Sequence, residues 1–118
     1  MRRLLPCLPV LLLATACSGG ASRAPLASGT GPVAVEIRDY AFGPAAATVR
    51  AGTPVTWTEH DPDIEGAGAH SVVADDGAFA SAPRLAAGAA FTWTPPAPGT
   101  YAYHCGIHNY MTGTLTVV

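Results

Sequence analysis

Hydrophobic and polar residues alternate in short stretches along the chain from Val33 onward. Val33, Val35 and Ile37, for example, are each followed by a polar or small residue. Successive side chains of a strand point to opposite faces of a sheet, so a period of two indicates strands with one buried face. The pattern predicts seven strands, within residues 33–38, 48–50, 55–58, 70–74, 91–94, 101–105 and 113–118.

Turn-forming residues separate these stretches, as in Asp75-Asp76-Gly77 and in the proline-rich segment at 95–99. The chain holds 13 Gly and 11 Pro, which suits many short elements joined by turns. No stretch shows a convincing helical period. We therefore expect an all-β protein, a Greek-key β-sandwich of about seven to eight strands. Its core is expected to include the aromatic residues Trp57, Phe91, Trp93, Tyr101 and Tyr103.

The first 17 residues have a different character. A basic start is followed by an apolar run from Leu4 to Leu13, which is too short to span a bilayer but suits an export signal. The run ends in Ala14-Thr15-Ala16-Cys17, which resembles a bacterial lipobox in which Cys17 is lipidated. An ordinary signal peptide, cleaved nearby, is the alternative. Residues 18–32, rich in Ser, Gly, Ala and Pro, predict a flexible tether, which leaves 33–118 as the folded domain.

Composition excludes some functions. The 118 residues make one domain at most, and 12% charged residues with a net charge of −2 argue against nucleic-acid binding. Six of the eight acidic residues lie within 18 positions, and they are Glu59, Asp61, Asp63, Glu65, Asp75 and Asp76. They form either a solvated loop or a surface that steers a cationic partner. His60 and these carboxylates could also form a second metal site, but their spacing in the sequence does not support one.

Metal chemistry is indicated near the C-terminus. Cys105 is followed by His108 and Met111, which puts a thiol, an imidazole and a thioether within seven residues at the end of a predicted strand. This is the ligand set of a blue-copper site, which needs one more histidine. His70 is the candidate for it, with His60 as an alternative, and Met111 has the alternative role of filling the core. His104 alternates to the face opposite Cys105, so it is expected to meet solvent or a partner.

The stretch from Tyr101 to Gly113, with its Cys-x-x-His-x-x-Met spacing, resembles the ligand loop of the small cupredoxins, the amicyanins and plastocyanins. Further matches lie at 39–44, 49–57, 70–72 and 98–103, so the resemblance covers the whole folded unit. It implies four copper ligands, His70, Cys105, His108 and Met111, around one type 1 copper ion. Many relatives carry at the place of Glu59 an asparagine that helps tie the ligand loops together.

The resemblance implies an electron carrier of the cell envelope rather than an enzyme, because the extra histidines of a multicopper enzyme are absent. The expected partners are redox proteins such as a c-type cytochrome, a dehydrogenase or an oxidase. We expect a monomer, anchored through Cys17 on the outer face of the cytoplasmic membrane or in the periplasm. Electrons would pass through His108 within an apolar patch formed by Ile107, Tyr110 and either Phe42 or Pro44. A copper chaperone or buffer is the first alternative, and a structural zinc module is the second.

Overall fold

The computed structural model describes residues 31–62 and 69–118. These residues form strands, turns and loops, and among them no helix is long and apolar enough to cross a membrane. The predicted signal peptide and nearly all of the tether lie outside the described residues, as do Asp63 and Glu65. The strands are β1 (Val33–Arg38), β2 (Ala41–Gly43), β3 (Ala46–Val49), β4 (Val55–Glu59), β5 (Val73–Ala74), β6 (Ala90–Trp93), β7 (Gly99–His104) and β8 (Thr112–Val117).

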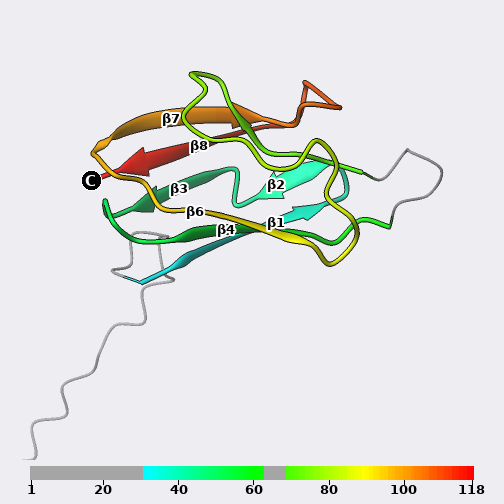
Figure 1. Ribbon diagram of the computed structural model, residues 1–118, viewed down its shortest axis with the longest axis horizontal. Coiled ribbons are helices and arrows are strands. Elements are labelled where there is room, and N and C mark those ends of the chain that lie inside the picture. The colour runs from blue at the N-terminus through cyan, green and yellow to red at the C-terminus, as the bar shows by residue number, and fades with distance from the viewer. Residues whose placement is uncertain (1–30, 63–68) are drawn as a thin grey trace, which may run out of the picture.

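The eight strands form two four-stranded sheets, which pack face to face (Figure 1). One sheet has the order β2-β1-β4-β6 and the other β3-β8-β7-β5. Both are mixed, since β1 runs parallel to β4 and β3 runs parallel to β8, whereas the other pairs are antiparallel. The predicted all-β sandwich of seven to eight strands is confirmed.

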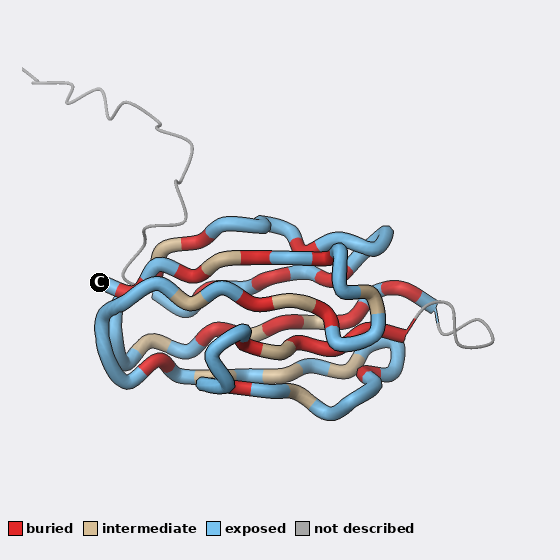
Figure 2. Tube along the Cα trace, turned by 90° about the horizontal axis from the view of Figure 1, so that it is seen from above, coloured by how far each residue is buried: buried red, intermediate tan, exposed pale blue. Residues whose placement is uncertain are grey.

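The core lies between the sheets and is filled by the apolar face of each strand. In β1 every second residue is buried, and Figure 2 shows the same alternation along the neighbouring strands. The fully buried Trp57 ring lies at the centre, with ring centroids 5.4 Å from both Phe79 and Tyr103. Of the five aromatic residues expected in the core, Trp57 and Tyr103 are buried, whereas Phe91, Trp93 and Tyr101 pack against its edge and remain partly exposed.

Two elements differ from the predicted strands by more than the position of their ends. The sequence pattern missed β2, because only Phe42 of its three residues faces the core and a single buried position shows no period. The predicted strand at 70–74 shrinks to β5, because His70 only bridges Leu85 and the next two backbone N–H groups bind side chains. The N–H of Ser71 points at Cys105 Sγ, and that of Val72 donates to Ser81 Oγ.

The metal-ligand candidates gather at one end of the sandwich. The loop that joins β7 to β8 lies at the end opposite the C-terminus (Figure 1, orange). The turn between β1 and β2 and the end of β4 reach the same place, because hydrogen bonds link Asp61 after β4 to Asp39 in the turn and to His70. The sandwich therefore brings segments far apart in sequence to a single site.

Candidate metal centre

Three predicted ligand side chains meet at this end of the sandwich. His70, Cys105 and His108 each offer a ligand atom, and these atoms lie within 4.8 Å of one another. His70 Nδ1 lies 3.9 Å from Cys105 Sγ and 3.2 Å from His108 Nδ1. His70 and Cys105 are fully buried, whereas His108 is half-buried. The structure thus groups two imidazoles and one thiol, with only one imidazole near solvent.

A tight loop carries two of these residues and Met111. Cys105 follows the last residue of β7, and its N–H donates to the carbonyl oxygen of Met111 at 3.0 Å. The N–H of Met111 donates in turn to the carbonyl of His108. These bonds close the loop just before β8 begins, and they leave the Met111 side chain 2% exposed. Ligation by Met111, and by the four predicted residues together, stays a prediction.

Backbone N–H groups surround the sulfur atom. Those of Ser71 and His108 both point at Cys105 Sγ from 3.4 Å. Hydrogen bonds to a cysteine sulfur spread its negative charge, and in blue-copper sites they tune the reduction potential. Ser71 has a second role, since its hydroxyl oxygen accepts the N–H of Gly106 at 2.8 Å. The segment that carries His70 is thereby fastened to the cysteine loop.

A carboxylate lies behind His70. The Nε2–H of His70 donates to Asp61 Oδ2 at 3.0 Å, on the side of the ring away from Cys105. Burial opposes the charge of Asp61, but the hydrogen bonds from the backbone of Asp39 and Tyr40 and from His70 outweigh it and lower the pKa of this carboxyl. Asp61 is therefore a carboxylate at neutral pH, in contact with a predicted ligand.

Glu59 lies one step further in. It continues the buried face of β4 after Val55 and Trp57, and it is fully buried. Its Oε1 accepts the N–H of Asp61 at 2.8 Å, while its Oε2 has no hydrogen-bond partner among the described residues. Burial raises the pKa of this carboxyl above its ordinary value. Glu59 thus holds the backbone of Asp61 in place through a buried hydrogen bond.

For Glu59 and Asp61 these positions correct both interpretations of the acidic segment, as a solvated loop and as a steering surface. Glu59 and Asp61 are buried and hydrogen-bonded, so they contribute no exposed charge that could steer a partner. The alternation of β4 carried the signal for Glu59, since a polar residue took the next inward position after Trp57. Asp75 and Asp76 are exposed, as a steering role requires.

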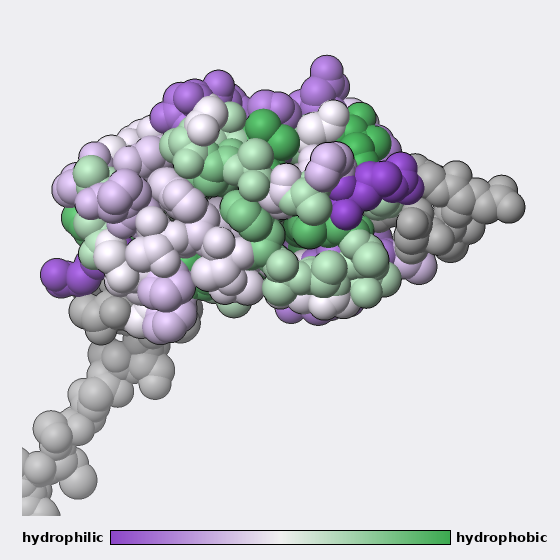
Figure 3. Space-filling view, viewed as in Figure 1, coloured by the Kyte–Doolittle hydropathy of each residue, from purple (hydrophilic) through white to green (hydrophobic). Residues whose placement is uncertain are grey.

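The sequence pattern also missed Tyr40. Its ring lies edge-on to both histidines, with centroids 5.2 Å from His70 and 5.1 Å from His108. Tyr110 also packs against His108, with ring centroids 5.8 Å apart. Tyr40, Ile107 and Tyr110 are exposed large hydrophobic residues, and here we call them the apolar patch. Figure 3 shows strongly hydrophobic atoms on the surface at this end of the molecule.

Of the two alternative members of the patch, Phe42 and Pro44, Phe42 needs a correction. Phe42 is buried, and its ring packs on Tyr103 at 4.9 Å, so it does not contribute to the patch. Pro44 is exposed, so its place in the patch stays a prediction. Tyr40 takes the place beside His108 because the turn between β1 and β2 points toward the site.

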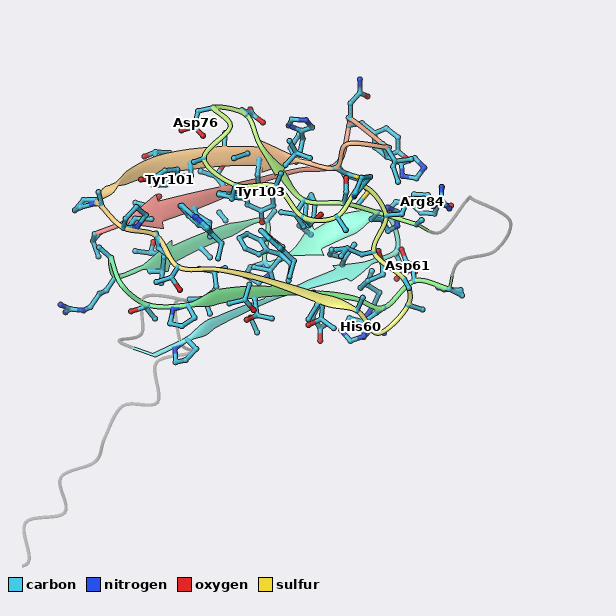
Figure 4. The ribbon with its side chains drawn as sticks, viewed as in Figure 1. His60, Asp61, Asp76, Arg84, Tyr101 and Tyr103 are labelled. Carbon is cyan, nitrogen blue, oxygen red and sulfur yellow. The ribbon has the colours of Figure 1, made fainter. Side chains whose placement is uncertain are left out.

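The remaining histidines lie elsewhere. His60 Nε2 lies 3.6 Å from Glu36 Oε1, on the exposed side of the β1–β4 sheet (Figure 4). The alternative that placed His60 among the ligands therefore finds no support in the geometry. His104 is partly exposed, and its Nδ1–H donates to Asp75 Oδ1 at 2.6 Å. Together with Asn109 and Thr112, these two residues line a shallow surface hollow, so His104 faces away from Cys105 as expected.

The donor set distinguishes between metals. Two imidazoles and a thiolate, with a weak thioether near, form the ligand set of type 1 copper. Structural zinc sites take four strong ligands from cysteine, histidine or carboxylate. Among the described residues, the cluster around Cys105 holds three such donors, because the carboxylates of Glu59 and Asp61 group on the far side of His70. The site fits one type 1 copper ion.

Comparisons with known proteins agree with this assignment. The sequence model of the cupredoxin-like domain family matches residues 7–117. A copper-containing nitrite reductase from Thermus scotoductus SA-01 superposes with a TM-score of 0.66 at 33% identity, over 74% of this chain but only 22% of that one. A reduced copper(I) form of an amicyanin variant superposes with a TM-score of 0.64 at 26% identity, over 76% and 85% of the two chains.

Amicyanin from Paracoccus versutus, 22% identical over 74% of this chain and 81% of that one, shares the fold with a TM-score of 0.62. No curated protein sequence matches the chain at a significant level. The two sheets, the grouped donors and the match over almost the entire sequence lead to one assignment. The chain belongs to the cupredoxin-like domain family.

Proposed function

We propose that this protein is a blue-copper electron carrier of the cell envelope, which moves single electrons between redox proteins. One observation carries the proposal: His70, Cys105 and His108 converge on one point from two segments that a β-sandwich holds in place. Copper bound there would supply a one-electron couple between Cu(I) and Cu(II). The fold supplies the rigidity that such a couple needs.

The rigidity comes from backbone and side-chain contacts on each predicted ligand. Cys105 is held by the closed loop and by two N–H groups at its sulfur, and His70 is held by Asp61. Cu(I) and Cu(II) prefer different geometries, so a donor set that cannot rearrange keeps the cost of changing oxidation state small. Buried, hydrogen-bonded donors therefore favour fast electron exchange.

His108 is the proposed route for electrons. It is the half-buried member of the cluster, and its ring contacts both Tyr40 and Tyr110 of the apolar patch. An exposed apolar patch marks a docking surface, and weak redox complexes bury little area. A c-type cytochrome, a dehydrogenase or an oxidase that docks here would come within reach of the imidazole.

Cyclic voltammetry of the copper-loaded protein tests this function. We expect one reversible one-electron wave. The protein should keep its copper in both the oxidised and the reduced form. Tyr110→Ala should slow electron exchange with a redox partner without moving the potential, because Tyr110 is 67% exposed and is not one of the predicted ligands. An irreversible wave, or loss of copper on reduction, would show that the site does not cycle.

The alternative is a copper chaperone or buffer, which must release its metal to another protein. The two fully buried donors and the closed loop favour retention instead. Transfer of copper from the loaded protein to an apo-acceptor within the mixing time would favour the alternative. The nitrite reductase likeness covers only 22% of that enzyme, so it gives no reason to propose catalysis here.

The envelope location rests on the first 17 residues alone. Lipidation of Cys17 would anchor the domain through the tether, because several acyl chains on one cysteine hold a membrane firmly. Expressed in a bacterial host, the protein should partition with membranes, and Cys17→Ala should release it. A mature chain with an unmodified N-terminus at another residue would contradict the anchor.

A further inference from the structure

We propose that Asp61 is a positioning residue for the metal centre, which fixes the orientation and proton of His70 and favours the more highly charged oxidation state of the bound ion. The inference rests on the proposed copper function and adds a residue that the predicted ligand set does not include. His60 separates Asp61 from the end of β4, and the backbone N–H of Asp61 is anchored by a hydrogen bond to Oε1 of Glu59, the last residue of that strand.

Both oxygens of Asp61 are engaged. Oδ1 accepts the backbone N–H of Asp39 at 2.8 Å, and Oδ2 accepts that of Tyr40 at 3.2 Å as well as the Nε2–H of His70 at 3.0 Å. The side chains of Asp61 and His70 are 10% and 0% exposed, so little water competes for these bonds. The carboxylate therefore has a fixed place and a fixed direction toward the imidazole.

The turn that donates these N–H groups is shaped around the carboxylate. Asp39 and Tyr40 both have positive φ, at 52° and 58°, although neither is glycine. Two residues in the left-handed conformation form the tight hairpin turn between β1 and β2. This conformation costs conformational free energy for a bulky residue such as tyrosine. Bonds to Asp61 offset the cost, and the same turn places the Tyr40 ring against both histidines.

The hydrogen bond decides which nitrogen of His70 is free. A carboxylate accepts and never donates, so Nε2 must carry the proton. Nδ1 then keeps its lone pair, and it faces Cys105 Sγ and His108 Nδ1. A histidine that ligates a metal commonly donates its other N–H to a carboxylate, which fixes the ring and strengthens the ligand. Asp61 thus prepares His70 to bind before the ion arrives.

The charge of Asp61 has a second consequence. A buried negative charge next to a ligand stabilises whichever oxidation state of the site carries more positive charge, which is copper(II) here. Loss of a hydrogen-bond partner behind a ligating histidine commonly costs about 10–100-fold in metal affinity. Asp61→Asn should therefore weaken copper(II) binding about tenfold relative to copper(I), and a tenfold ratio corresponds to a rise of about 59 mV for one electron.

The first arm of the test needs no metal. Nitrogen-15 NMR of the metal-free protein at about pH 8, above the ordinary range of imidazole titration, reports which ring nitrogen carries the proton. We expect His70 to hold it on Nε2 and to exchange it slowly with water, whereas the exposed His60 exchanges fast. Asp61→Asn should abolish the slow exchange, because an amide cannot accept all three N–H groups. Should that variant fail to fold, the comparison of His70 with His60 in the wild type still decides.

The second arm uses the copper-loaded protein and a matched control. Asp75→Asn also removes a carboxylate that binds a histidine, but that histidine is His104, which faces away from the site. We expect Asp61→Asn to raise the reduction potential and Asp75→Asn to leave it near the wild-type value. Equal shifts in both variants would reduce Asp61 to one of several nearby charges, which contradicts the proposal.

The two arms separate this inference from the proposed function. A wild type that binds no copper, or binds it without a blue colour, refutes the electron carrier and leaves the NMR arm standing. A blue wild type whose metal-free His70 carries its proton on Nδ1, or whose Nε2–H exchanges as fast as that of His60, refutes the role of Asp61. An Asp61→Asn protein with the wild-type potential refutes it as well.

Discussion

The hydroxyl oxygen of Ser71 accepts the backbone N–H of Gly106 at 2.8 Å, which joins the residue after His70 to the residue after Cys105. The two segments approach so closely that a Cβ on Gly106 would lie 2.9 Å from the Ser71 oxygen and 3.3 Å from Val73 Cγ2. The bond therefore joins the histidine segment and the cysteine loop at a place where the two pack closely.

Ser71→Ala should loosen this connection. It leaves the N–H of Gly106 without its acceptor in a partly buried place, which costs about 1–3 kcal/mol of unfolding free energy. Ser81→Ala is a matched control, because Ser81 Oγ likewise accepts a backbone N–H, that of Val72. Denaturant unfolding should show a lower unfolding free energy than that of the wild type in both variants. Only Ser71→Ala should also alter the visible spectrum of the copper form, and an identical spectrum in both would contradict the loop connection.

Gly113→Ala should destabilise the fold itself. A Cβ there would lie 2.2 Å from Cζ of the buried Tyr103, a contact that neither strand backbone can relieve without moving. Overpacking in a core costs about 1–3 kcal/mol and occasionally more. Gly43→Ala is the control, because no atom of the described residues, apart from its two chain neighbours, lies within 4 Å of its Cβ position. Melting temperatures that fall equally in the two variants would contradict the packing of β8 on Tyr103.

Glu59→Gln should reveal a pH dependence of stability. Burial raises the pKa of Glu59, so the folded state binds its proton more tightly than the unfolded state does. The wild type is then most stable with respect to this group below the ordinary pKa of 4.5, and it loses that stability as pH rises through the raised value. Gln carries no titrating proton. The stability of Glu59→Gln relative to the wild type should therefore increase as pH rises from the ordinary pKa to the raised pKa of Glu59.

Denaturant unfolding of the metal-free proteins at a series of pH values measures this difference. The unfolding free energy of Glu59→Gln minus that of the wild type should increase with pH and then level off. A difference that stays constant from acid to neutral pH would mean that the pKa of Glu59 is not raised.

Met111 tests the predicted axial ligand. Its thioether is expected to bind weakly, so Met111→Leu should keep the copper and the blue colour while raising the reduction potential, because losing a donor disfavours Cu(II). Met111→Gln brings a harder oxygen donor and should lower the potential. Voltammetry of both variants provides the check. Potentials equal to that of the wild type would assign Met111 to the core alone.

Alternation predicted most of the fold, because a strand with one buried face shows its period directly. The inward residues of β1, Val33, Val35 and Ile37, are all buried as expected. The three-residue β2 has no period to show, and its existence depends on a turn with two positive φ values. The pair Asp39-Tyr40 contains no glycine, the residue that most clearly predicts such a turn from sequence.

The part of the candidate site that could be predicted is the part whose residue types and spacing are typical of metal ligands. Cys105, His108 and the remote His70 meet as expected, because few other roles suit that combination of donors. Asp61 and Tyr40 escaped prediction, because their contacts with His70 span 9 and 30 positions of sequence and depend on where the sandwich brings the loops. Such contacts follow from topology, which the local pattern does not contain.

The most direct test of the account is the addition of copper(II) to the metal-free protein, followed by visible absorption and EPR spectroscopy. A thiolate, two imidazoles and a weak axial donor predict an intense visible thiolate-to-copper band and a narrow copper hyperfine splitting at one ion per chain. Cys105→Ser should remove the colour and leave the β-sandwich folded by circular dichroism. A colourless stoichiometric copper(II) complex of the wild type, or a Cys105→Ser protein that stays blue, would contradict the copper site proposed here.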